Sequence, residues 1–191
     1  MGRAQSKLTE QQLDELAQTT HFSRRELKKW NKDFVRDCPS GRLKKSEFRN
    51  IYQEFFPNGS VDRFADAVFN VFDTNGDGFI TFQEFIVALS ITSRGDLEQK
   101  LDWAFSLYDH DKDGFITKEE MTAVIEAIYD LVGRDYSPTG AHSPRSKVDK
   151  IFARMDANSD GKLSKEEFKL GSRTDPWVVN ALSLEQMGEN E

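Results

Sequence analysis

The chain has 191 residues, of which 37% are hydrophobic and 31% charged, a composition typical of a globular protein. Its formal net charge of −7 argues against nucleic acid as a main partner, and no apolar run approaches the roughly 20 residues of a membrane-spanning helix. The single cysteine, Cys38, excludes an intramolecular disulfide and suits a reducing cytosol.

The N-terminal segment carries a lipidation motif. Residues 1–7 read Met-Gly-Arg-Ala-Gln-Ser-Lys, so removal of Met1 would expose the amine of Gly2 for N-myristoylation. One myristoyl chain binds membranes only marginally, with a constant of about 10⁴ M⁻¹, so stable binding needs a second signal. Basic residues near this end supply a candidate: Arg3, Lys7, Arg24, Arg25, Lys28, Lys29 and Lys32. The alternative is that they form an ordinary solvated helix face.

Four related twelve-residue segments begin at Arg36, Asp73, Asp109 and Asp156, and such a repeat predicts one structural unit used four times. In the last three segments, oxygen-bearing side chains stand at positions 1, 3, 5, 9 and 12, and glycine stands at position 6. This is the ligand spacing of an EF-hand calcium loop, in which the backbone carbonyl of position 7 also binds the ion.

The first segment, residues 36–47, keeps the framework of such a loop but not its ligands. Glycine stands at position 6 and glutamate at position 12, whereas Arg36, Cys38 and Lys44 replace the oxygen ligands at positions 1, 3 and 9. Cationic side chains and a thiol are poor partners for a hard cation. We therefore expect a hand that packs but does not bind calcium.

The other three segments are predicted calcium sites, with Mg²⁺ as a candidate occupant at resting calcium. The predicted ligands are Asp73, Asn75, Asp77, Phe79, Thr81 and Glu84 in the second loop; Asp109, Asp111, Asp113, Phe115, Thr117 and Glu120 in the third; and Asp156, Asn158, Asp160, Lys162, Ser164 and Glu167 in the fourth. The third loop offers four carboxylates, and the others offer three carboxylates and an asparagine. Because ligand charge favours tight binding, we expect the third loop to fill first.

Apolar residues recur at helical spacing on both sides of each loop, which predicts helix–loop–helix units. Position 8 is apolar throughout, and in an EF-hand it pairs with the neighbouring loop; the four residues are Leu43, Ile80, Ile116 and Leu163. We therefore predict an all-α fold of four EF-hands in two pairs, with short antiparallel β pairings between paired loops.

The predicted boundary between the pairs is Ser-Arg-Gly at residues 93–95, where glycine ends a helix. Residues 1–93 would form the N-terminal pair, and residues 94–191 the C-terminal pair with a tail. The longer step between the last two loops, residues 133–146, contains Pro138, Gly140 and Pro144 and predicts a flexible loop.

The N-terminal half has more large apolar residues than a pair of hands can bury. Core packing accounts for some of them, such as Phe69 and Phe72. The others are candidates to line a groove that opens on calcium binding and accepts an amphipathic helix of a target protein. These candidates are Trp30, Phe34, Phe48, Ile51, Tyr52, Phe55, Phe85, Leu89 and Trp103.

Several segments together resemble the neuronal calcium sensor family, with the frequenin branch nearest. They are Gly2 with Ser6-Lys7-Leu8, Asp37-Cys38-Pro39-Ser40-Gly41 in the first hand, Asn-Val-Phe-Asp at residues 70–73, and Ser-Arg-Gly at residues 93–95. The likeness runs from Gly2 to about Leu184. It implies a myristoylated cytoplasmic calcium sensor with three working sites, acting peripherally at Golgi, plasma or synaptic membranes.

The resemblance also implies partners. They are phosphatidylinositol 4-kinase, a guanine-exchange factor and chaperone for G-protein α subunits, and membrane receptors or channels, each docking a helix in the N-terminal groove. It allows a weak homodimer as well. Two departures from the frequenin pattern are the absence of an acidic stretch in residues 133–146 and a polar tail at residues 185–191. The polar tail puts self-regulation by the tail in doubt.

Two other classes compete with a sensor. A calcium buffer would have the same loops but would barely open, so a calcium-induced rise in binding of an apolar dye separates the two. The third possible class is an enzyme. However, the three histidines, His21, His110 and His142, lie far apart in the sequence, and no residue pattern gives Cys38 a catalytic partner. We therefore expect no enzymatic activity, although a calcium sensor of this kind would be expected to regulate an enzyme.

Overall fold

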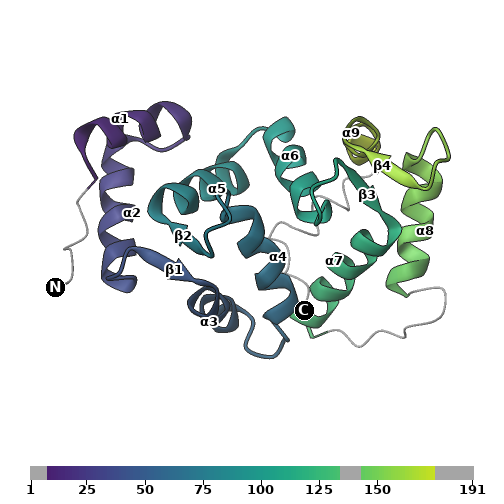
Figure 1. Ribbon diagram of the computed structural model, residues 1–191, viewed down its shortest axis with the longest axis horizontal. Helices are drawn as coiled ribbons and strands as arrows, with labels where there is room; N and C mark the ends of the chain where they lie inside the picture. The colour runs from purple at the N-terminus through teal and green to yellow at the C-terminus, as the bar shows by residue number, and fades with distance from the viewer. Residues whose placement is uncertain (1–7, 134–142, 175–191) are drawn as a thin grey trace.

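The computed structural model describes residues 8–133 and 143–174 (Figure 1). Several predictions therefore lie outside the described residues. They concern Gly2 with Ser6, the basic residues Arg3 and Lys7, Pro138 and Gly140 in the long loop, His142, and the tail at residues 185–191.

The described part of the chain is mainly helical, with nine helices and two small antiparallel sheets, which confirms the predicted fold class. Its first half contains α1 (Glu10–Thr19), α2 (Arg24–Asp37), β1 (Arg42–Lys44), α3 (Lys45–Phe55), α4 (Asp62–Phe72), β2 (Phe79–Thr81) and α5 (Phe82–Arg94). Its second half contains α6 (Leu97–Tyr108), β3 (Phe115–Thr117), α7 (Lys118–Leu131), α8 (Pro144–Met155), β4 (Lys162–Ser164) and α9 (Lys165–Thr174).

Each sheet joins the loops of two neighbouring hands. In the first, β1 pairs with β2 and Leu43 lies opposite Ile80. In the second, β3 pairs with β4 and Ile116 lies opposite Leu163. All four side chains are buried, because the middle residue of each three-residue strand points toward the helices and its two neighbours point away. The pairing predicted from position 8 is therefore confirmed in both halves.

Aromatic side chains fill the core of each half. In the first half, the Phe48 ring lies 5.1 Å from that of Tyr52, 5.7 Å from Phe69 and 5.5 Å from Phe72, between centroids. In the second half, Phe168 contacts Phe105 at a centroid distance of 5.7 Å. In the first half these contacts join the helix that leaves the first loop to the helix that enters the second, and in the second half they join the helix that enters the third loop to the helix that leaves the fourth.

The N-terminal helices are tied to the end of α5. Arg94 donates hydrogen bonds to the carbonyl of His21 at 3.0 Å and to the Glu26 carboxylate at 2.7 Å. The Arg94 hydrogen bond, with those from Ser23, lowers the pKa of Glu26 to about 2. The backbone N–H of His21 donates to Ser90 Oγ at 2.8 Å. The start of α2 is thereby held against α5.

The two halves pack against each other through α4 and α7, which lie side by side in Figure 1. Arg63 on α4 pairs with Glu126 at 3.0 Å and with Asp130 at 3.2 Å on α7. The backbone N–H of Ser60 donates to the carbonyl of Asp130 at 2.8 Å. Gly59 approaches the backbone of Leu131 so closely that a Cβ would lie 1.7 Å from its oxygen.

The predicted boundary coincides with the end of α5 at Arg94, where the Gly95 N–H donates to the carbonyl of Ile91 at 3.0 Å. The contacts between α4 and α7 nevertheless join the halves. The division into separate units at residues 93 and 94 stays a prediction.

Candidate metal centre

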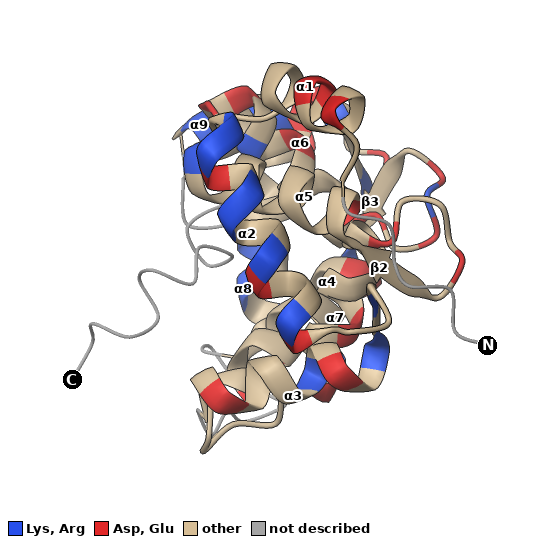
Figure 2. Ribbon diagram, turned by 90° about the vertical axis from the view of Figure 1, so that its left-hand side faces the viewer, with Lys and Arg blue, Asp and Glu red and all other residues tan. Residues whose placement is uncertain are grey.

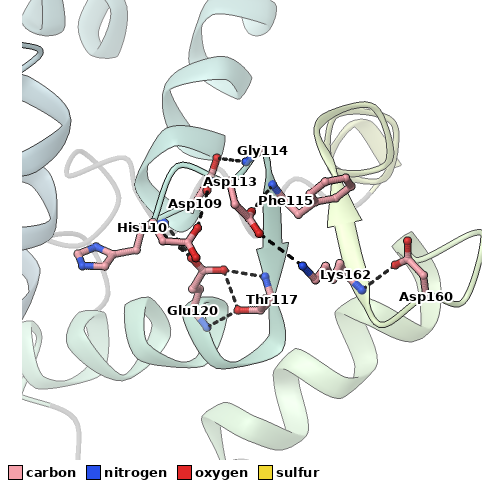
Figure 3. Close-up of polar contacts among 10 residues, drawn as sticks. Asp109, His110, Asp113, Gly114, Phe115, Thr117, Glu120, Asp160 and Lys162 are labelled. Carbon is pink, nitrogen blue, oxygen red and sulfur yellow. Dashed lines mark hydrogen bonds and ion pairs between the residues drawn. The ribbon is translucent and has the colours of Figure 1, made fainter.

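The glutamate at position 12 closes each of the last three loops in the same way. Glu120 Oε2 accepts hydrogen bonds from the Thr117 N–H at 2.9 Å and hydroxyl at 2.7 Å, and its Oε1 accepts from the His110 N–H at 3.0 Å (Figure 3). Thr117 is the N-cap of α7 and Glu120 is its third residue, so the two form a capping box. The same motif that starts the helix therefore fixes the position 9 and position 12 oxygens.

The second and fourth loops repeat this arrangement. Glu84 Oε2 accepts from the Thr81 N–H at 2.9 Å and hydroxyl at 2.8 Å. Glu167 Oε2 accepts from the Ser164 N–H and hydroxyl at the same two distances. Burial of the carboxylate acts to raise the pKa of Glu84, but the hydrogen bonds outweigh it, and they also lower the pKa of Glu167. Each glutamate therefore remains an anion near neutral pH.

The aspartates of the third loop are turned inward by backbone hydrogen bonds (Figure 3). Asp109 Oδ2 accepts from the Gly114 N–H at 3.2 Å, and Asp113 Oδ1 accepts from the Phe115 N–H at 2.8 Å. Gly114 has a φ of 88°, which a residue with a Cβ rarely adopts, and this conformation makes the sharp turn between the two aspartates. Ligand atoms of Asp109, Asp111 and Glu120 all lie within 4.8 Å of one another.

The first aspartate of this loop is buried. Asp109 is 7% exposed, and its Oδ1 has no hydrogen-bond partner among the described residues. Burial, together with the nearby charges of Glu120 and Asp113, raises the pKa of Asp109. A buried carboxylate oxygen without a partner, in a ring of hard oxygen donors, is the environment that a hard divalent cation satisfies. The donor set therefore fits calcium.

The second and fourth loops have the same inward turn with one carboxylate fewer. Asp73 accepts from the N–H groups of Asp77 at 3.1 Å and Gly78 at 2.9 Å, and Asn75 Oδ1 also accepts from the Asp77 N–H at 2.8 Å. In the fourth loop, Asp156 accepts from Asp160 at 3.2 Å and Gly161 at 3.0 Å. Asn158 Oδ1 accepts from the Asp160 N–H at 2.9 Å.

The position 7 residues, whose carbonyls are predicted ligands, begin the three short strands that form positions 7 to 9 of these loops. Phe79 begins β2, Phe115 begins β3 and Lys162 begins β4. The ligand role of these carbonyls stays a prediction.

In the first hand, hydrogen bonds and ion pairs between protein groups hold the loop. The backbone N–H of Lys44 donates to Glu47 at 2.8 Å, and the Gly41 N–H donates to the Cys38 carbonyl at 2.8 Å. Arg36 pairs with Asp33 at 3.0 Å and with Asp37 at 2.9 Å. Burial, with the charges of Glu47 and Asp37, raises the pKa of the Cys38 thiol, so it is not a thiolate ligand near neutral pH.

The nine predicted groove residues come from α2, α3, α5 and α6 and differ in burial. Phe34, Phe48 and Tyr52 are buried, and Phe85, Leu89 and Trp103 are partly buried against the core. Trp30, Ile51 and Phe55 are exposed, Phe55 by 74%. Val35 on α2 is also exposed, and helical spacing does not predict it as a groove residue, because a position five residues after Trp30 does not share its face of the helix.

The basic residues of α2 divide into two groups. Arg24 pairs with Glu10 and Asp14, and Lys28 lies 3.4 Å from Glu10, so α1 neutralises part of the charge. Arg25, Lys29 and Lys32 are exposed and make no ion pair with the described residues. Figure 2 shows the resulting basic bands along α2. Within residues 8–133 and 143–174, no helix is long and apolar enough to cross a membrane.

Paired helix–loop–helix units with inward-turned acidic loops define an EF-hand calcium-binding protein. Comparison with known families agrees: the EF-hand domain pair matches residues 98–171, and the EF hand domain matches residues 64–92. Neuronal calcium sensor 1 of Aplysia californica is 50% identical over 190 residues, covering 99% of this chain and 100% of the relative. The same protein of Lymnaea stagnalis is 48% identical with the same coverage. The chain belongs to the neuronal calcium sensor family, and its relatives fit the frequenin branch.

Proposed function

We propose that this protein binds Ca²⁺ in its second, third and fourth loops and uses the ions to expose a docking groove on its N-terminal half. The exposed apolar side chains of Trp30, Ile51 and Phe55 on this half carry the proposal. The loops supply the trigger, because filling them changes the charge at the ends of the helices that bear the groove. Mg²⁺ is the proposed occupant of the loops at resting calcium.

The proposed occupant of the groove is an amphipathic helix of a membrane-associated target. The groove side chains belong to α2, α3, α5 and α6, and they are apolar over several helical turns, which suits a helix that presents one apolar face. The proposed targets are those implied by the family: phosphatidylinositol 4-kinase, an exchange factor and chaperone for G-protein α subunits, and receptors or channels. The protein acts on them as a regulator, and we propose no catalytic role for it. The weak homodimer stays a prediction.

Calcium is expected to raise the fluorescence of an apolar dye several-fold, because opening exposes the partly buried groove residues. Phe55→Asp should lower this calcium-dependent signal and weaken binding of an amphipathic helical peptide. Leu170→Asp is the matched control, since Leu170 is 68% exposed but lies on α9 in the other half. If calorimetry shows calcium binding and the dye signal does not rise, the protein is a buffer and the sensor proposal is wrong.

We further propose that the protein binds the cytoplasmic faces of Golgi, plasma or synaptic membranes through myristoylated Gly2 and the basic face of α2. The charges of Arg25, Lys29 and Lys32, which are exposed and form no ion pair within the described part of the chain, support this second signal. Each basic residue near an anionic surface contributes about 1 kcal/mol, or about fivefold in affinity. The contribution falls at high salt because screening shortens the range of the attraction.

Lys29→Gln and Lys32→Gln are each expected to weaken binding of the myristoylated protein to phosphatidylserine vesicles by about fivefold. The measurement is vesicle sedimentation at low and high salt. Lys100→Gln on α6 is the control for a simple change of net charge. Equal effects of all three variants would contradict a role for the α2 face.

A further inference from the structure

The side chain of Lys162 leaves its own loop and reaches the neighbouring one. Its backbone N–H donates to Asp160 Oδ1 at 2.9 Å within the fourth loop. Its ammonium Nζ lies 3.4 Å from Asp113 Oδ2 in the third loop (Figure 3). Asp113 is the predicted position 5 ligand of the third loop, so a fixed cation of the protein touches one of the oxygens that a bound ion would use.

The β pairing places Lys162 there. In the antiparallel register Thr117 lies opposite Lys162 and Phe115 lies opposite Ser164, so the side chain at the start of β4 runs beside β3. The Lys162 ammonium also lies 5.4 Å from the centroid of the Phe115 ring. A cation over an aromatic face is attracted to it, and this second contact holds the ammonium near Asp113.

The N-terminal pair offers a comparison within the same chain. Arg42, at position 7 of the first hand, lies over the Phe79 ring with its Cζ 5.4 Å from the centroid, as Lys162 lies over Phe115. The ion pairs among the described residues include none between Arg42 and Asp77, the position 5 residue of the second loop. The contact with a loop carboxylate therefore distinguishes the third loop from the second.

We propose that Lys162 sets the calcium affinity of the third loop. Its ammonium competes with the ion for Asp113 and opposes the approach of a dication, which reduces, without cancelling, the gain in affinity from the extra carboxylate that Asp111 gives this loop. The ion pair alone is weak, because its side chains are 46% and 38% exposed. The repulsion between the Lys162 ammonium and a divalent ion a few ångströms away is larger than the energy of this ion pair. We expect it to lower the calcium affinity of the third loop by about three- to tenfold.

The inference rests on the proposed function of the third loop as a calcium site, and the test isolates that loop. The background carries Glu84→Gln and Glu167→Gln, and calcium is titrated by calorimetry with the Gly114 amide resonance as a second reporter. Lys162→Met removes the charge and keeps the apolar stem and the backbone carbonyl. It is expected to tighten binding about three- to tenfold, whereas Lys162→Arg should stay near the background value.

Lys112→Met is the matched control, because Lys112 is an exposed residue of the third loop at position 4, which is not a ligand position. It removes the same charge without the contact to Asp113 and is expected to change affinity less than about twofold. Equal effects of Lys162→Met and Lys112→Met, or weaker binding in Lys162→Met, would overturn the role of Lys162. Absence of calcium binding in the background itself would overturn the third loop as a site, and the inference with it.

Discussion

Glu120→Gln is expected to abolish the tightest calcium-binding phase of the protein, lowering the affinity of the third loop by about a hundredfold or more. The carboxylate supplies two ligand oxygens and half of the capping box of α7. The Glu120 carboxylate accepts hydrogen bonds from Thr117 and His110 with both of its oxygens. A neutral amide has only one oxygen, and its NH₂ group would face one of these donors. The second and fourth loops should continue to bind, because each has its own glutamate.

The measurement is calorimetric titration of Glu84→Gln, Glu120→Gln and Glu167→Gln beside the unchanged protein. Only Glu120→Gln should remove the first phase if the four carboxylates of the third loop make it fill first. Glu119→Gln is the matched control, since Glu119 is the exposed neighbour of Glu120 in the first turn of α7 and is not a predicted ligand. An intact first phase in Glu120→Gln would show that the extra carboxylate does not set the order.

Gly59→Ala is expected to destabilise the calcium-free protein by about 2–3 kcal/mol. A Cβ at this position would lie 1.7 Å from the Leu131 oxygen and 2.5 Å from its carbonyl carbon. Both atoms are backbone at the end of α7, so no side-chain rotation relieves the clash. The turn between α3 and α4 must move away, which breaks the hydrogen bond from Ser60 to Asp130 and strains the Arg63 ion pairs.

Thermal unfolding in the presence of a chelator measures this effect, and a loss of this size lowers the midpoint by about 5–10 °C in a chain of this length. Ser60→Ala is the control, because it keeps the backbone N–H that bonds to Asp130 and should leave the midpoint nearly unchanged. An unchanged midpoint in Gly59→Ala would mean that the close contact between the halves contributes little to the stability of the fold.

Contiguous residues determine most of what the sequence predicts correctly. An EF-hand loop is twelve consecutive residues, so the spacing of its oxygens already places them around one turn, and the same threonine and glutamate start the next helix. The apolar residue at position 8 predicts the pairing of Leu43 with Ile80 and of Ile116 with Leu163 because each sheet joins two adjacent repeats. These features need no knowledge of distant contacts.

Burial within the proposed groove depends on tertiary packing. Phe48, Ile51, Tyr52 and Phe55 follow helical spacing on α3 and look like one apolar stripe. Yet Phe48 and Tyr52 are buried against α4, whereas Ile51 and Phe55 are exposed. Periodicity identifies the apolar face of a helix but cannot tell how much of that face a neighbouring helix covers.

The sequence by itself therefore determined the repeat, the helical fold class and the pairing of hands, because each is encoded within one unit or between adjacent units. Only the tertiary structure decided that Gly59 and Arg63 join the halves, and that the Lys162 ammonium touches Asp113. These contacts link residues about 50 to 70 positions apart. Their geometry follows from how helices and strands pack, which local spacing does not specify.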